Sequence, residues 1–202
     1  MADDAPDIVF LRHGVTQWNA ERRIQGQRDV RLSVEGQRQA AALASALRWH
    51  FPDITDRTFY ASPLARARQT MGAVLETLGE PFDRVTFDER LKERSFGEWE
   101  GRRWQELLDG GLDPDGDPEA FFHWRPEEGG ESLAEVAERV KAFLSEMRSP
   151  ALIVAHVGIY RVLLHLLNGL PPASVARLPM AQTRFCRFHD GAIDWFTATT
   201  DL

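Results

Sequence analysis

Apolar positions along the chain fall into two alternating patterns. Short runs of consecutive apolar residues are typical of strands buried on both faces, and they predict strands at residues 7–12, 58–61, 85–87 and 151–155. Between them, apolar residues near helical spacing predict helices at residues 33–50, 64–78, 99–108, 132 to about 148, and 159–167. Two further runs, at 184–188 and 192–197, flank Asp190-Gly191 and predict a hairpin.

Strands that alternate with helices predict an α/β fold with a mostly parallel central sheet flanked by helices. The length of 202 residues is typical of one domain, so we expect a single domain over residues 1–202. Residues 112–130 are rich in Pro, Gly and Asp but also hold Phe121, Phe122 and Trp124. A linker rarely carries three aromatic residues so close together, so we interpret residues 101–130 as an insertion or lid over the site.

The charge balance narrows the classes of partner. The chain has 24 basic and 31 acidic residues, a net charge of −7, which disfavours nucleic acid and anionic membrane surfaces. An anionic substrate would need positive charge concentrated at one place. The single cysteine, Cys186, rules out an intrachain disulfide and is consistent with a cytoplasmic protein. Residues 1–7 lack the features of a secretory signal, and the apolar runs are too short to span a membrane. Nothing in the sequence indicates an oligomeric state.

Two predicted strands end in a histidine followed closely by a glycine. The strand at 7–12 leads into His13-Gly14, and the strand at 151–155 leads into His156-Val157-Gly158. A single histidine in such a place is typical of a turn or core residue. Two at equivalent places suggest a site, because parallel sheets bind ligands at the carboxyl ends of their strands. Arg12 favours phosphate as the ligand, since guanidinium binds phosphate oxygens bidentately.

A metal site is not supported by the residue spacings. The other four histidines do not pair with a second ligand at zinc spacing, and there is no H-E-x-x-H. Asp113, Asp115 and Asp117 imitate the start of a calcium loop, but Pro118 stands where the glycine is needed and Trp124 where the closing acid is needed. We therefore expect no metal.

Seven segments, in order, resemble the histidine phosphatase superfamily, also called phosphoglycerate-mutase-like. They are LRHGVTQWN at 11–19, IQG at 24–26, LSVEG at 32–36, SPLARARQT at 62–70, LKERSFGEWEG at 91–101, GES at 130–132 and VAHVG at 154–158. The resemblance covers residues 7 to about 170. Val15 stands where many members have glutamate, and Val157 replaces a glycine.

The resemblance implies a three-layer α/β sandwich with a phosphoglycerate-mutase-like fold, and a metal-independent phosphomonoesterase without a cofactor. His13 would be the nucleophile that forms a phosphohistidine, and Glu93 the general acid and base. Arg12, Arg66 and His156 would surround the phosphoryl group. The remaining residues expected to bind phosphate or substrate are Asn19, Gln25, Gly26 and Val157.

Several details remain open at this level. A neutral, nucleophilic His13 needs an acceptor for one ring nitrogen, and the carbonyl of Gly14 or of a neighbour is a candidate. The charge of His156 is undetermined. Arg22 and Arg23 fit surface positions as well as the phosphate loop, and Arg66 read without the motif is a solvated helix residue. The aromatic residues of the insertion fit either a wall over the leaving group or simple packing.

Three functions are compatible with these residues. The first is hydrolysis of a small phosphorylated metabolite. The second is a cofactor-dependent phosphoglycerate-type mutase, which is disfavoured because the insertion holds Arg102, Arg103 and Arg125 but no lysine and many acids. The third is a phospho-ligand-binding or interaction protein with weak activity, which the complete set of expected catalytic groups disfavours. The substrate itself is not indicated.

Overall fold

The structure is a computed structural model that describes residues 6–126, 128–148 and 150–198. The interpretation of residues 1–7 as lacking a secretory signal therefore rests largely on positions outside the described residues. A six-stranded sheet forms the centre, in the order β3-β2-β4-β1-β5-β6. Its strands are β1 (Ile8–Arg12), β2 (Thr58–Ala61), β3 (Val85–Phe87), β4 (Ala151–Ala155), β5 (Arg184–His189) and β6 (Ala192–Thr197).

The first four strands of the sheet are parallel, as the alternating pattern predicts. β1 pairs with β4, β4 with β2, and β2 with β3, all in parallel register. β5 and β6 form the predicted hairpin and add to the edge of β1 in antiparallel fashion. Asp190 and Gly191 both have positive φ angles, 48° and 72°, as a tight turn with a type I′ backbone requires.

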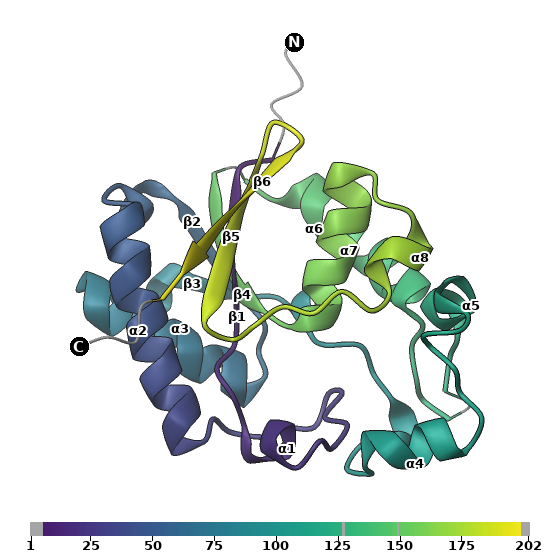
Figure 1. The fold of residues 1–202 in the computed structure, drawn as a ribbon. Coiled ribbons are helices and arrows are strands. Elements are labelled where there is room, and N and C mark those ends of the chain that lie inside the picture. The colour runs from purple at the N-terminus through teal and green to yellow at the C-terminus, as the bar shows by residue number, and fades with distance from the viewer. Residues whose placement is uncertain (1–5, 127, 149, 199–202) are drawn as a thin grey trace.

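Helices cover both faces of the sheet, which confirms the three-layer prediction (Figure 1). α2 (Val34–His50) and α3 (Ala65–Leu78) pack on one face, and α6 (Leu133–Glu146) and α7 (Val157–Asn168) on the other. The residues of β1 alternate between the two cores, because successive strand residues point to opposite faces. Val9 and Leu11 pack with α2 and α3, whereas Ile8 and Phe10 pack with α6 and α7.

The long helices begin and end close to the predicted residues because capping residues fix their ends. The Ser33 side chain accepts a hydrogen bond from the Gly36 amide at the start of α2. Ser132 and Glu135 form both hydrogen bonds of a capping box at the start of α6. α3 ends at Gly79, whose φ of 73° is the left-handed conformation typical of a helix C-terminus.

The helix predicted at 99–108 is wrong in its first half. The chain forms a short 3₁₀ turn, η4 (Gly97–Trp99), and only then α4 (Trp104–Asp109). Backbone hydrogen bonds with another segment compete with the helix here. The Gly101 amide donates to the Ile24 carbonyl, and the Ile24 amide donates to the Arg102 carbonyl. Periodicity alone cannot reveal such a distant partner.

The described part of residues 101–130 runs from the loop beside α1 (Gln17–Ala20) along the α6–α7 side of the molecule (Figure 1). It contains α4 and α5 (Pro118–His123), and α5 packs against α8 (Pro172–Val175). Phe121 and Phe122 on α5 are each 2% exposed and belong to the core that includes α6 and α7. These aromatic side chains therefore anchor the segment to the body. The remaining elements are η1 (Ile54–Asp56), η2 (Phe82–Arg84) and η3 (Glu89–Leu91).

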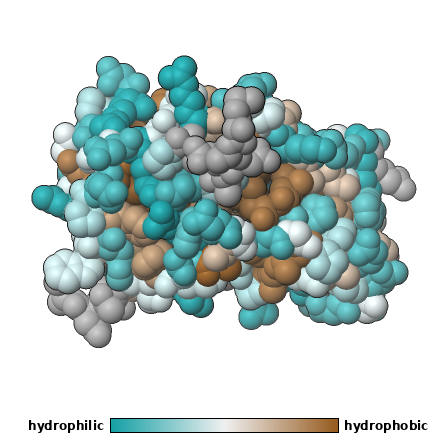
Figure 2. Space-filling view, turned by 90° about the horizontal axis from the view of Figure 1, so that it is seen from above, coloured by the Kyte–Doolittle hydropathy of each residue, from teal (hydrophilic) through white to brown (hydrophobic). Residues whose placement is uncertain are grey.

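Hydrophilic residues make up most of the surface seen from above, interrupted by a few apolar patches (Figure 2). Val34, Trp49 and Phe82 are the large apolar residues of the described chain that are well exposed. Within the described ranges, no helix is both long and apolar enough to cross a membrane.

Candidate active site

The two histidines that follow strands lie side by side. In the register of the parallel pair β1 and β4, Arg12 stands opposite Ala155, so His13 and His156 leave the sheet at the same level. Their ring centroids are 5.1 Å apart. Ser62, which follows β2 on the other side of β4, lies 2.7 Å through its Oγ from Nε2 of His156. The sheet thus brings three strand ends to one point.

The ring of His13 is fixed in the tautomer that a nucleophile needs. Its Nδ1 lies 2.7 Å from the Gly14 carbonyl oxygen. A carbonyl can only accept, so Nδ1 carries the proton and donates, and Nε2 keeps its lone pair. The acceptor considered from the sequence, the Gly14 carbonyl, is the one the structure uses.

Both rings are buried among positive charge. His13 is 3% exposed and His156 is fully buried. Burial lowers the pKa of His13 well below the usual value for histidine, and Arg66 and Arg12 lower it further by repelling a second positive charge. Burial and Arg66 likewise hold the pKa of His156 well below its usual value. These shifts favour the neutral form of both imidazoles near pH 7, including His156, whose charge the sequence left open.

Arg66 is buried, so the interpretation of its side chain as a solvent-exposed residue on a helix surface is wrong. It is 1% exposed. Its two terminal nitrogens donate to the carbonyls of Arg28, at 2.8 Å, and of Gly26, at 2.7 Å. Burial lowers the pKa of Arg66 to about 10, so it stays charged at neutral pH. Arg12 donates through one terminal nitrogen to the Met180 carbonyl. Neither arginine has a carboxylate partner at ion-pair distance among the described residues.

Three buried polar atoms of this cluster have no hydrogen-bond partner. They are Nε of Arg12, Nε of Arg66 and Nδ1 of His156. Buried polar atoms are nearly always paired in native proteins, so unpaired ones need an explanation. An oxyanion with several acceptor oxygens would satisfy such donors. The cluster therefore has the properties of a binding site for a phosphoryl group.

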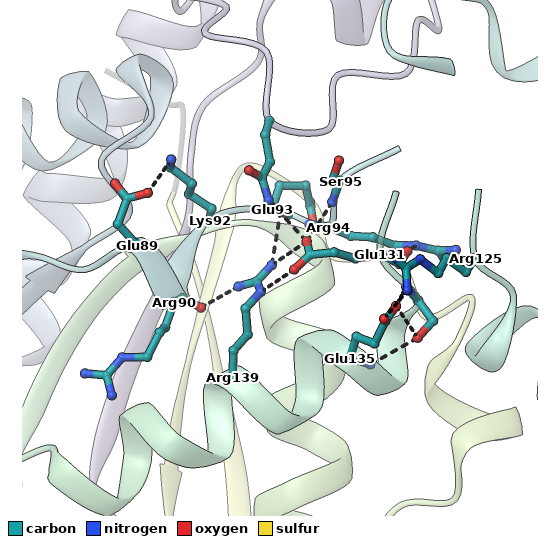
Figure 3. Close-up of polar contacts among 12 residues, drawn as sticks. Glu89, Arg90, Lys92, Glu93, Arg94, Ser95, Arg125, Glu131, Glu135 and Arg139 are labelled. Atoms are coloured by element: carbon teal, nitrogen blue, oxygen red, sulfur yellow. Dashed lines mark hydrogen bonds and ion pairs between the residues drawn. The ribbon is translucent and has the colours of Figure 1, made fainter. Parts of the chain in front are cut away.

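Glu93 is held against the first turn of α7. The Gly158 amide donates to both carboxylate oxygens, at 3.1 and 3.3 Å, and the Arg94 amide donates at 2.9 Å. The backbone of this segment is fixed by Arg139 on α6, which donates to the Glu93 carbonyl and pairs with Glu131 (Figure 3). Glu131 in turn accepts from the Ser95 amide. This network determines where the Glu93 carboxylate lies.

The loop after β1 supplies the neutral part of the site. Asn19 accepts hydrogen bonds from the Thr16 amide and from Gln182, and Gln25 accepts from the Thr16 hydroxyl. Gly26 adopts a φ of 50°, and a Cβ there would lie 2.0 Å from Oε1 of Glu100. The left-handed conformation favours glycine at this position, whose carbonyl accepts from Arg66.

A cavity of about 320 Å³ opens beside these groups. Among the predicted residues, its lining includes Arg12, His13, Asn19, Gln25, Gly26, Arg66, Glu93 and Val157. Val157, which stands where the family has a glycine, is thus part of the cavity wall. Phe121 also lines the cavity, whereas Phe122 packs on His165. The aromatic residues thus serve both as wall and as packing.

Sequence reasoning missed several lining residues. From the sequence, Arg22 and Arg23 fitted either the surface or the phosphate loop. Arg23 lines the cavity, where its side chain pairs with Glu21 at 2.6 Å. The residues that were not considered are Ile24, Arg94, Phe96, Trp104, Leu133, Gly158, Arg161, Arg177 and Pro179. Most come from the segment after Glu93, from the insertion and from the chain after α7. These residues are far apart in the sequence, and only the fold brings them together around one cavity.

A family model described as histidine phosphatase superfamily (branch 1) matches residues 8–196. The chain belongs to the histidine phosphatase superfamily. A glucosyl-3-phosphoglycerate phosphatase of Mycolicibacterium vanbaalenii is 34% identical over 181 residues, covering 81% of this chain and 75% of that protein. A probable phosphoglycerate mutase GpmB of Shigella boydii is 31% identical over 197 residues, covering 89% of this chain and 83% of that protein.

A solved structure extends the similarity to the fold. The mycobacterial glucosyl-3-phosphoglycerate phosphatase in complex with VO3 has a TM-score of 0.76 and 30% identity, and it covers 95% of this chain and 96% of that chain. These similarities confirm the predicted histidine phosphatase family, its phosphoglycerate-mutase-like fold and the prediction that the chain is a phosphatase.

The acidic residues that imitate a calcium loop have structural roles in this histidine phosphatase. Asp113 accepts from the Gly116 amide and Asp117 caps α5 by accepting from the Ala120 amide, both at 2.8 Å. Across the residues that the structure describes, no group of three or more His, Cys, Asp or Glu side chains is placed to hold a metal ion.

The two buried neutral histidines make stability depend on pH. Above about pH 6.5, both rings are neutral in the folded and in the unfolded chain, so they do not change the free energy of unfolding with pH. Below it, the unfolded chain binds two protons that the folded chain does not, because the folded pKa values are lowered. We expect the free energy of unfolding to fall with a limiting slope of about 2.7 kcal/mol per pH unit.

Urea unfolding at several pH values between 7.5 and 5.5 measures this slope. These values lie above the pH range in which most carboxylates titrate. The variant His13→Asn removes one of the two groups and halves the slope. His123→Gln, which removes an exposed histidine of α5, is the control. A wild-type stability that stays flat to pH 5.5 contradicts the burial of two neutral rings.

Proposed function

We propose that this histidine phosphatase hydrolyses a small phosphorylated metabolite through a phosphohistidine on His13, without a metal. The observation that carries the proposal is the state of His13. Its Nδ1 is bound to the Gly14 carbonyl, so the lone pair of Nε2 is free in a cavity lined by Arg12 and Arg66. A neutral imidazole is a good nucleophile toward phosphorus, and two fixed guanidinium groups stabilise the charge that builds up during transfer.

The first half of the reaction transfers the phosphoryl group to the enzyme. Nε2 of His13 forms a bond to phosphorus while the bond to the ester oxygen breaks, and protonated Glu93 gives its proton to that oxygen. The alcohol leaves. In the second half, a water attacks phosphorus, Glu93 takes its proton, and the bond to Nε2 breaks. Phosphate leaves and His13 is again neutral with its proton on Nδ1.

His156 acts as a hydrogen-bond donor in this proposal. With the Ser62 hydroxyl donating to Nε2, the proton of His156 lies on Nδ1, the atom that has no protein partner. That N–H would donate to a phosphoryl oxygen. Since its ring is neutral, His156 contributes a hydrogen bond and no charge to the bound phosphoryl group.

The mutase alternative receives less support from the position of the basic residues in the insertion. Arg125 is paired with Glu135 at 2.8 Å, and Arg102 is exposed near Glu98. Arg102, Arg103 and Arg125 are absent from the cavity lining among the described residues. A mutase must hold a second phosphate or a carboxylate while it returns the first, and among the described residues the insertion places no basic side chain in the cavity for it.

An assay of released phosphate separates the three functions. We expect the protein to release phosphate from p-nitrophenyl phosphate and, faster, from some members of a panel of phosphorylated metabolites, with kcat on the order of 10 s⁻¹ for the best one. An excess of EDTA leaves these rates unchanged. Faster phosphate transfer from 2,3-bisphosphoglycerate to monophosphoglycerate than hydrolysis would indicate a mutase. Binding of phosphate without any turnover would indicate a binding protein.

A further inference from the structure

The carbonyl that fixes the tautomer of His13 belongs to a peptide group that is held at its other edge as well. The Gly14 carbonyl accepts from Nδ1 of His13 at 2.7 Å. The Val15 amide lies on the opposite edge of the same planar peptide group and donates to Oε1 of Gln39 at 2.9 Å. Among the residues that the structure describes, this amide has no other acceptor. Because the group is planar, a rotation that breaks one of these bonds breaks the other.

The first turns of α2 carry the residues that hold this peptide group. Ser33 donates to the Val15 carbonyl through both its amide, at 3.0 Å, and its hydroxyl, at 3.1 Å. A Cβ at Gly36 would lie 1.9 Å from the Val15 carbonyl oxygen, so only a glycine lets the helix come this close to the loop. Gln39 follows three residues later and thus lies on the same face of α2. The half-buried Gln39 side chain is therefore directed at the loop after β1.

The charge of the His13 ring changes during the proposed reaction. Nε2 gives its lone pair to phosphorus while Nδ1 keeps its proton, so the ring becomes positive as the bond to the ester oxygen breaks. A hydrogen bond from a charged donor is stronger than one from a neutral donor. The Gly14 carbonyl therefore stabilises the transition state more than the resting enzyme, which accelerates the transfer. A hydrogen bond accepted from the amide edge of the same peptide group polarises the carbonyl and strengthens this effect.

We infer that Gln39 is a positioning residue for the nucleophile: its side-chain oxygen orients and polarises the peptide group whose carbonyl stabilises the positive His13 ring. The inference rests on the proposed function. Gln39 is absent from the cavity lining among the described residues, so it acts only through the peptide group. It therefore promotes bond formation at Nε2 and leaves unchanged the binding of a free phosphate ion, which the two arginines of the cluster hold.

Two anions separate this role from simple packing. Inorganic phosphate binds without a bond to Nε2, whereas vanadate becomes five-coordinate on a nucleophile and so resembles the transition state. We expect Gln39→Met, which lacks the oxygen acceptor, to lower kcat/KM for p-nitrophenyl phosphate about tenfold, since this constant reports the phosphorylation of His13. Inhibition by vanadate weakens by a similar factor, while the inhibition constant of phosphate stays within about twofold. Gln39→Glu, whose carboxylate also accepts from the amide, retains the wild-type kcat/KM at pH 7.5.

The matched control is Gln37→Met, which makes the same change at an exposed position of α2 and should behave as the wild type. An unchanged kcat/KM in Gln39→Met overturns the inference. Equal weakening of phosphate and vanadate also overturns it, because the loop as a whole would then have moved. A loss of about tenfold in Gln39→Glu overturns it whether or not Gln39→Met folds. If the wild type itself releases no phosphate, the proposed function fails and this inference with it.

Discussion

The variant His13→Asn loses hydrolysis of p-nitrophenyl phosphate by a factor of about 10⁴ or more in kcat while keeping its fold. The loss is this large because the nucleophile is removed and no other group near the phosphoryl site can replace it. Asparagine keeps an N–H that can donate to the Gly14 carbonyl, so the turn after β1 is preserved. Steady-state rates give the factor, and circular dichroism with a thermal melt checks the fold.

Rapid acid-free denaturation of the enzyme during turnover of a ³²P-labelled substrate tests the intermediate directly. The wild type should carry a label that is stable to alkali and lost in acid, as expected of a phosphorus–nitrogen bond, and His13→Asn should carry none. His123→Asn is the matched control, because its ring is exposed and lies outside the cavity lining. A folded His13→Asn protein with normal turnover would exclude the phosphohistidine mechanism.

The elements that the sequence predicted well are those whose signals are local. The apolar run of β4 and the start of α6, where Ser132 and Glu135 form a capping box, each depend on neighbouring residues, and both lie where they were predicted. The same is true of the turn at Asp190-Gly191. The start of α4 was misplaced because residues 101–102 bond to Ile24, which is distant in the chain.

The same distinction applies to the site. His13 and His156 could be paired from sequence because both follow strands that the alternating pattern made parallel. The contact between Ser62 and His156 could not, since it requires β2 to lie next to β4, and the order of strands in the sheet differs from their order in the chain. Arg161 had a visible signal, because it is the arginine in an otherwise mostly apolar helix. Its place in the cavity wall could not be predicted, because it depends on how α7 packs in the fold.

Glu93→Gln should separate the two halves of the reaction. Glutamine cannot protonate the ester oxygen, so kcat/KM for an alkyl phosphate such as glycerol 3-phosphate falls by about 10² to 10⁴. p-Nitrophenolate leaves without a proton, so phosphorylation of His13 by p-nitrophenyl phosphate stays fast. Hydrolysis of the phosphohistidine still needs a base for the attacking water. Stopped-flow measurements should therefore show a burst of one p-nitrophenolate per enzyme, followed by a slow steady state.

Gly158→Ala tests the position of the same carboxylate without changing its chemistry. A Cβ at Gly158 would lie 2.1 Å from Oε1 of Glu93, so the side chain must move away. Because the group displaced is the end of a flexible side chain, the fold tolerates the change, and the variant should show the burst of Glu93→Gln with a normal thermal melt. Glu98→Gln, which removes an exposed acid of η4, should behave as the wild type. If Glu93→Gln loses activity equally on alkyl and p-nitrophenyl phosphates without a burst, Glu93 positions the phosphoryl group and does not transfer the proton.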